Sequence, residues 1–225
     1  MKTSIFLVLA GCVALVASQL AGFGAGQIVS KLTASSAFLA VATNAGALDS
    51  RYGRILLSGL ALSWLGDACL LGSTGQLFLF GLISFALAHV VYIAAFAVRG
   101  MNSRWVALAF VPIATISLGV SVWLTPFVSS EMLIAVWIYT LVISLMVIAA
   151  FGVKGAGGPV LIPLGALLFY ASDLSVAAGQ YVQPEFPNYV WGLPFYYAGQ
   201  LLLALSTRSE TRRTPQPGSN SLSSV

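Results

Sequence analysis

Residues 76–98 read QLFLFGLISFALAHVVYIAAFAV, a nearly unbroken apolar run between the turn-forming GSTGQ at 72–76 and Arg99. A helix crosses the hydrocarbon core of a bilayer with about 20 apolar residues, so this run is long enough to span a membrane. The whole chain is 59% hydrophobic and 7% charged, whereas soluble domains carry about 25% charged residues. Such a composition predicts an integral membrane protein.

Seven further apolar segments resemble this one, and turn-forming residues separate them. We therefore predict an all-α fold, a polytopic membrane helical bundle with eight transmembrane helices in one domain, residues 1–206. The expected spans are 4–22, 31–48, 54–72, 76–98, 104–124, 130–152, 158–180 and 188–206. The remaining residues, 207–225, are polar and rich in Ser, Pro and Arg, which is typical of a disordered tail.

The basic residues indicate how the bundle is oriented. With eight spans, nine of the ten fall on one face: Lys2, Arg51, Arg54, Arg99, Arg104, Lys154, Arg208, Arg212 and Arg213. By the positive-inside rule this face is cytoplasmic, so both termini are expected in the cytoplasm. The same basic residues are dispersed between apolar runs, which does not suit nucleic-acid binding.

The first segment has an alternative interpretation. MKTSIFLVLAGCVALVAS at 1–18 resembles a signal peptide, and LAGC at 9–12 resembles a lipoprotein cleavage site. The apolar run continues to about Leu20, and cleavage would disturb the charge pattern. We therefore favour a retained first span. The two cysteines, Cys12 and Cys69, lie inside apolar runs without metal-ligand spacing and are expected to be buried thiols.

Three ionisable side chains lie well inside the expected spans: Asp67, Asp173 and His89, the only histidine. A charge at the centre of a span costs about 2.5–3.5 kcal/mol, so such residues usually face the bundle interior. Asp67 shares a small and polar stripe with Gly59 and Ser63, which indicates contact with a neighbouring helix. At 1.5 Å per residue both carboxylates lie about 8–10 Å below the outer end of their spans. We expect them to share a polar pocket, with His89 deeper.

Other polar residues are placed to join this pocket. Tyr92 follows His89 by three residues, Ser172 precedes Asp173, and Tyr197 and Gln200 lie on one side of the last span. Lys31 is expected at the outer end of the second span. Each of these residues alone has a simpler interpretation, because polar side chains also join helices and lysines also extend to lipid headgroups.

Four motifs occur in a fixed order: S-x-x-G-D within 62–71, F-x-x-x-H-x-x-Y within 80–96, F-x-x-S-D within 165–177, and YYAGQLLLA at 196–204. Together they resemble the YhhN family of membrane proteins, the lysoplasmalogenases, over most of the chain. The sequence departs from the family pattern in the second span, where Lys31 is followed by Leu32 and the family usually has proline after the lysine. The resemblance implies an eight-span ether hydrolase that cleaves the sn-1 vinyl-ether bond of a lysoplasmalogen. The products are a fatty aldehyde and a glycerophospho-ethanolamine or -choline.

Vinyl-ether hydrolysis protonates a carbon, passes through an oxocarbenium ion and adds water, so two carboxylates can divide the work as in glycosidases. We expect Asp67 and Asp173 to form the acid/base pair, in an order that the sequence leaves open, and His89 to orient a carboxylate or water. Further substrate-binding or supporting residues are expected to be Lys31, Ser63, Tyr92, Ser172, Tyr197 and Gln200.

This chemistry requires no metal and no organic cofactor, and the expected partners are a lysophospholipid and bilayer lipids. We expect a multi-pass protein of the plasma membrane if the source is bacterial. A small transporter or proton-coupled carrier is the alternative, because intramembrane Asp and His residues also form proton relays.

Overall fold

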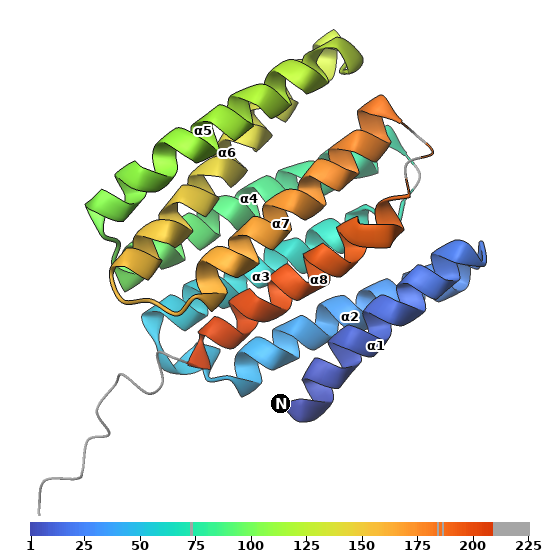
Figure 1. The fold of residues 1–225 in the computed structure, drawn as a ribbon. Helices are drawn as coiled ribbons and strands as arrows, with labels where there is room; N and C mark the ends of the chain where they lie inside the picture. Colours follow the sequence, from blue (N-terminus) through green and yellow to red (C-terminus); the bar gives the residue numbers. More distant parts are fainter. Residues whose placement is uncertain (73, 184, 186, 209–225) are drawn as a thin grey trace, which may run out of the picture.

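The computed structural model describes residues 1–72, 74–183, 185 and 187–208, and within them the fold is all-α. Eight α-helices run up and down in one bundle (Figure 1). Their bounds are α1 Lys2–Leu20, α2 Gly24–Asn44, α3 Arg51–Cys69, α4 Gly75–Arg99, α5 Ser103–Leu124, α6 Ser130–Gly155, α7 Leu161–Ala177 and α8 Asn188–Ser206. The predicted eight-helix membrane bundle is confirmed.

Consecutive helices pack as four antiparallel hairpins: α1–α2, α3–α4, α5–α6 and α7–α8. The hairpins join through α4 on α6, α6 on α7, and α2 on both α3 and α8. In Figure 1 the α5–α6 and α1–α2 hairpins flank the other four helices, and the N-terminus lies at the same end of the bundle as the end of α8. Two chain ends on the same side of the bundle agree with an even number of spans. That this side is cytoplasmic stays a prediction.

Among the described residues, five helices are long and apolar enough to cross a membrane by themselves: α1, α4, α5, α6 and α7. For α5 and α7 this includes the short helical segments that follow them, so that these spans run over Ser103–Phe127 and Leu161–Val182. The remaining three, α2, α3 and α8, carry more small and polar residues, among them Lys31, Asp67 and Gln200. These three side chains are largely or fully buried inside the bundle. The less apolar helices are therefore the ones that place polar groups in the protein interior.

The largest difference from the sequence-based ranges is at the start of the second helix. The second helix begins at Gly24, and not at 31, because the actual turn is at Gly22, which has a φ of +64°. Gly26 then lies within α2, where a side chain would collide with Ser18 of α1 and with Phe23 at the start of α2. At the other end Thr207, the first residue of the expected tail, is buried and donates to the carbonyl of Ala204 at 2.8 Å. Residues 209–225 of that tail lie outside the described residues.

Side-chain caps define where several helices begin. Ser50 accepts a hydrogen bond from the Gly53 amide at the start of α3, and Thr74 accepts one from the Leu77 amide at the start of α4. Asn102 does the same for α5. Such caps satisfy amides that have no partner inside the helix. They therefore fix where α3 and α4, the helices of Asp67 and His89, begin.

The close contact of α7 with α8 generates a stability prediction. In Gly199→Ala the new methyl group would lie 2.9 Å from the Gly165 carbonyl oxygen and 3.1 Å from the Phe169 amide nitrogen. Both are backbone atoms and cannot move aside, so we expect the variant to lose about 1–3 kcal/mol of stability. The measurement is unfolding of the detergent-solubilised protein followed by circular dichroism.

Gly119→Ala in α5 is the matched control, because nothing lies within 4 Å of the added methyl group. Alanine is the better helix former, so this variant should be unchanged or up to about 1 kcal/mol more stable. Equal stability of the two variants would show that α7 and α8 are not in close backbone contact.

Candidate active site

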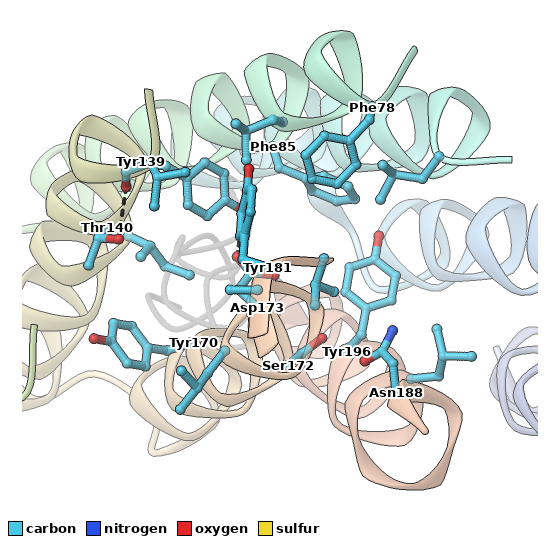
Figure 2. A pocket seen from close by; sticks show the side chains of 18 of the residues that line it. Phe78, Phe85, Tyr139, Thr140, Tyr170, Ser172, Asp173, Tyr181, Asn188 and Tyr196 are labelled. Carbon is cyan, nitrogen blue, oxygen red and sulfur yellow. Dashed lines mark hydrogen bonds between the residues drawn. The ribbon is translucent and has the colours of Figure 1, made fainter. Parts of the chain in front are cut away.

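A cavity of about 280 Å³ lies at one end of the bundle, where α1, α3, α5 and α7 end and the other helices begin. This is the end opposite to the N-terminus. Asp67 and Asp173 both line it, although they are far apart in the sequence and come from α3 and α7. The structure therefore brings the two predicted carboxylates to one cavity (Figure 2).

Asp67 is the centre of a cluster that we call the Asp67 cluster: Lys31, Ser35, Asp67 and Tyr196. The Ser35 and Tyr196 hydroxyls each donate to Oδ2 of Asp67 at 2.6 Å. The Lys31 ammonium lies 3.3 Å from Oδ1. A carboxylate with 2% exposure would be costly without partners, and these three donors offset part of that cost.

The position of Lys31 in its helix differs from the one predicted from the sequence. Because α2 begins at Gly24, Lys31 lies about 10 Å inside the helix and not at its outer end. Its side chain is 12% exposed and reaches both Asp67 and the cavity. An extension of this lysine to the headgroup region is therefore not observed.

Asp173 is the centre of a second cluster, the Asp173 cluster: His89, Tyr139 and Asp173. The Tyr139 hydroxyl donates to Oδ2 of Asp173 at 2.5 Å, and Nε2 of His89 lies 3.3 Å from the same oxygen. The Asp173 side chain is 17% exposed, while His89 is fully buried, below the wall of the cavity. Nδ1 of His89 has no hydrogen-bond partner among the described residues.

The two clusters are built alike, since each carboxylate contacts one tyrosine hydroxyl and one nitrogen group. They differ in that nitrogen group: a lysine ammonium beside Asp67 and an imidazole beside Asp173. The Phe169 ring lies between them, with its centroid 5.3 Å from that of Tyr196 and 4.7 Å from that of His89. This ring separates the clusters, so each carboxylate has its own set of partners.

Three predicted pocket residues do not reach the cavity. The Tyr92 hydroxyl donates to Oε1 of Gln200 at 3.1 Å and lies 3.1 Å from Oγ of Ser63, and all three side chains are fully buried. Tyr197 bonds to Ser35 and to the Lys31 carbonyl, behind the Asp67 cluster. Tyr92, Tyr197 and Gln200 are therefore not among the residues that line this cavity: Tyr92 and Gln200 lie deeper along α4 and α8, and Tyr197 faces α2. Ser63 lies behind the wall, and Ser172 lines the cavity.

The sequence analysis missed three site residues: Ser35, Tyr139 and Tyr196 as partners of the carboxylates. Ser35 follows Lys31 by four residues and thus shares its helix face, a signal that was available. Tyr196 stands one residue before Tyr197, and only the helix rotation decides which ring reaches Asp67. For Tyr139 the sequence holds no signal that distinguishes it from the other membrane-embedded aromatic residues.

The family model described as YhhN family matches residues 26–207, which include every residue of both clusters. The chain belongs to the YhhN family. It is 29% identical to lysoplasmalogenase TMEM86B of Sus scrofa over 73% of this chain and 68% of that protein. It is 30% identical to lysoplasmalogenase TMEM86A of Bos taurus over 66% of this chain and 62% of that protein. No solved structure matches the chain.

The Lys31–Asp67 ion pair generates a second prediction. In Lys31→Met the Asp67 carboxylate stays buried without its ammonium partner, which we expect to cost about 3 kcal/mol or more. The double variant Lys31→Met, Asp67→Asn removes the uncompensated charge and should recover part of that loss. Chemical unfolding in detergent measures the three proteins, and a Lys31→Met variant as stable as the wild type would contradict the ion pair.

Proposed function

We propose that this membrane protein is a lysoplasmalogenase, an ether hydrolase that cleaves the vinyl-ether bond of 1-alkenyl-glycerophospho-ethanolamine or -choline. The observation that carries the proposal is that two carboxylates with different partners line one cavity at the end of a membrane bundle. Two relatives of about 30% identity that are named lysoplasmalogenases support the same class of reaction.

Vinyl-ether hydrolysis has clear requirements. A general acid protonates the second carbon of the alkenyl chain, and the carbon bonded to the ether oxygen becomes an oxocarbenium ion. Water adds to that carbon and loses a proton to a base, which gives a hemiacetal. The hemiacetal collapses, with transfer of its hydroxyl proton to the departing glycerol oxygen, to the fatty aldehyde and the glycerophospho compound. The site therefore needs an acid that becomes a base, and a negative group near the cation.

Asp173 has the better position for proton transfer. Its side chain is partly exposed to the cavity, whereas Asp67 is almost fully buried. Tyr139 and His89 both contact Oδ2 and hold the carboxyl group in one orientation, with Oδ1 as the oxygen for proton donation. In our proposal protonated Asp173 donates to carbon and then, as a carboxylate, takes the proton of the attacking water.

Asp67 then serves as the permanent negative charge. Its two hydroxyl donors, from Ser35 and Tyr196, can stabilise the ionised form through the whole reaction without moving. A fixed charge that is already oriented stabilises a developing cation without reorganisation. Lys31 compensates this charge in the resting protein and also faces the cavity, where its ammonium is placed to meet the lipid phosphate. The substrate phosphate would then attract the Lys31 ammonium, so that the ammonium compensates less of the Asp67 charge.

The carboxylates provide the direct test of this proposal. We expect Asp173→Asn to lower aldehyde release from a lysoplasmenyl lipid by about 10²–10⁴-fold, the usual contribution of a general acid. Asp67→Asn should lower it by about 100-fold, the usual effect of removing one electrostatic stabiliser. Both are measured with purified, monodisperse protein.

Asp49→Asn is the matched control, because Asp49 is an exposed carboxylate in the short helix Ala47–Asp49, away from the cavity. It should keep wild-type activity. Full activity of either cavity variant removes that residue from the mechanism, and no aldehyde from the wild type with either headgroup rejects the proposed reaction.

Carbon protonation can also be followed with isotopes. Because the acid delivers a solvent-exchangeable proton to carbon, hydrolysis in D₂O should give an aldehyde with one deuterium on the carbon next to the carbonyl. Mass spectrometry of the trapped aldehyde measures it, with preformed aldehyde kept in D₂O as the control. An enzymatic product without deuterium would contradict an acid-catalysed mechanism.

A further inference from the structure

The cavity has two chemically different sides. Toward α2, α3 and α8 its wall carries Lys31, Asp67, Tyr196 and Asn188. Toward α5, α6 and α7 most lining side chains are apolar. Figure 2 shows this arrangement, with Tyr196 and Asn188 at one side of the cavity, Thr140 and Tyr170 at the other, and Asp173 between them. An amphiphilic ligand can therefore enter in only one favourable orientation.

The apolar side is formed by two helix stripes that line the same cavity. Val136, Thr140 and Ile143 are spaced by four and three residues on α6, and Tyr170, Leu174 and Ala177 have the same spacing on α7. This spacing places three side chains on one helix face. The α6 stripe is buried to more than nine-tenths at each position, so it faces protein and cavity and not lipid.

Thr140 does not make this wall polar. Its hydroxyl donates to the Val136 carbonyl of the preceding helical turn at 2.9 Å. A threonine bonded in this way uses its only donor within its own helix. The methyl group is then the part available to a ligand, which makes the stripe apolar over its whole length.

The reactive carboxyl group lies inside this apolar region. Tyr139 stands three residues after Val136 and four before Ile143, and Asp173 stands three residues after Tyr170, so their hydrogen bond joins the two stripes. A lipid whose ether bond lies at Asp173 therefore has its alkenyl chain next to the stripes. Apolar side chains of α3 and α4 also line the cavity (Leu70, Phe78, Leu82 and Phe85), but the two stripes are the ones that the Tyr139–Asp173 hydrogen bond joins.

We infer that the space between the α6 and α7 stripes binds the alkenyl chain of the lysolipid, and that Ile143 limits the length of chain accepted; this inference rests on the proposed function. Ile143 lies about 20 Å along α6 from Ser130, deeper than Val136 and Thr140. Its side chain is 3% exposed, so little free space lies behind it. The polar headgroup then points toward Lys31 and Asn188.

The experiment uses lysoplasmenyl lipids that differ only in the length of the alkenyl chain. Ile143→Phe shortens the binding space, so kcat/KM for long chains should fall relative to short chains, by roughly tenfold for each methylene that no longer fits. Ile143→Ala should shift the preference toward longer chains. Ile138→Phe is the matched control, since Ile138 lies on the same helix but is 54% exposed on the outer surface.

Binding of saturated 1-alkyl lysolipids, which carry no vinyl ether, separates this inference from the proposed function. Their affinities, measured by calorimetry in detergent, should show the same opposite shifts in Ile143→Phe and Ile143→Ala. Such shifts without turnover by the wild type would reject the hydrolase and still support the chain-binding site. An unchanged chain-length preference in both folded Ile143 variants, or an equal shift in Ile138→Phe, overturns the inference.

Discussion

The whole arrangement depends on keeping a carboxylate buried inside a membrane bundle. Asp67 has 2% exposure, and an isolated charge there would be prohibitively costly. Lys31, Ser35 and Tyr196 together offset part of this cost, and they come from α2 and α8 while Asp67 comes from α3. The cluster therefore joins α2, α3 and α8, the three helices that are not among the five long apolar ones. The interaction that stabilises the centre of the bundle is also the one that forms one side of the cavity.

The second carboxylate uses similar chemistry with a different result. Asp173 has a tyrosine partner like Asp67, but an imidazole takes the place of the ammonium, and its side chain is partly exposed. Lysine provides a lasting positive charge, whereas a histidine can hold or release a proton near neutral pH. The Phe169 ring keeps the two clusters apart. The two aspartates therefore have different environments. In carboxylate pairs, such a difference allows one carboxyl group to act as an acid while the other stabilises charge.

The polarity of the cavity fits the bilayer around it. Its polar wall and its opening lie at the end of the bundle, where lipid headgroups would be found, and its apolar stripes extend along α6 and α7 toward the middle. In the proposed reaction a single-chain lipid keeps its headgroup near water and its chain in apolar surroundings, with the ether bond at Asp173.

The sequence by itself determined the fold class and the two carboxylates. Apolar run length and turn residues predict eight helices, and the cost of intramembrane charge singles out Asp67, Asp173 and His89, because these rules act locally along the chain. Only the tertiary structure decided the partners. Whether Tyr196 or Tyr197 reaches Asp67, whether Lys31 turns inward, and whether Tyr139 meets Asp173 depend on helix rotation and depth. A rotation of one residue, about 100° around the helix, changes the neighbour completely, and the apolar pattern of a helix buried on several sides does not fix that rotation.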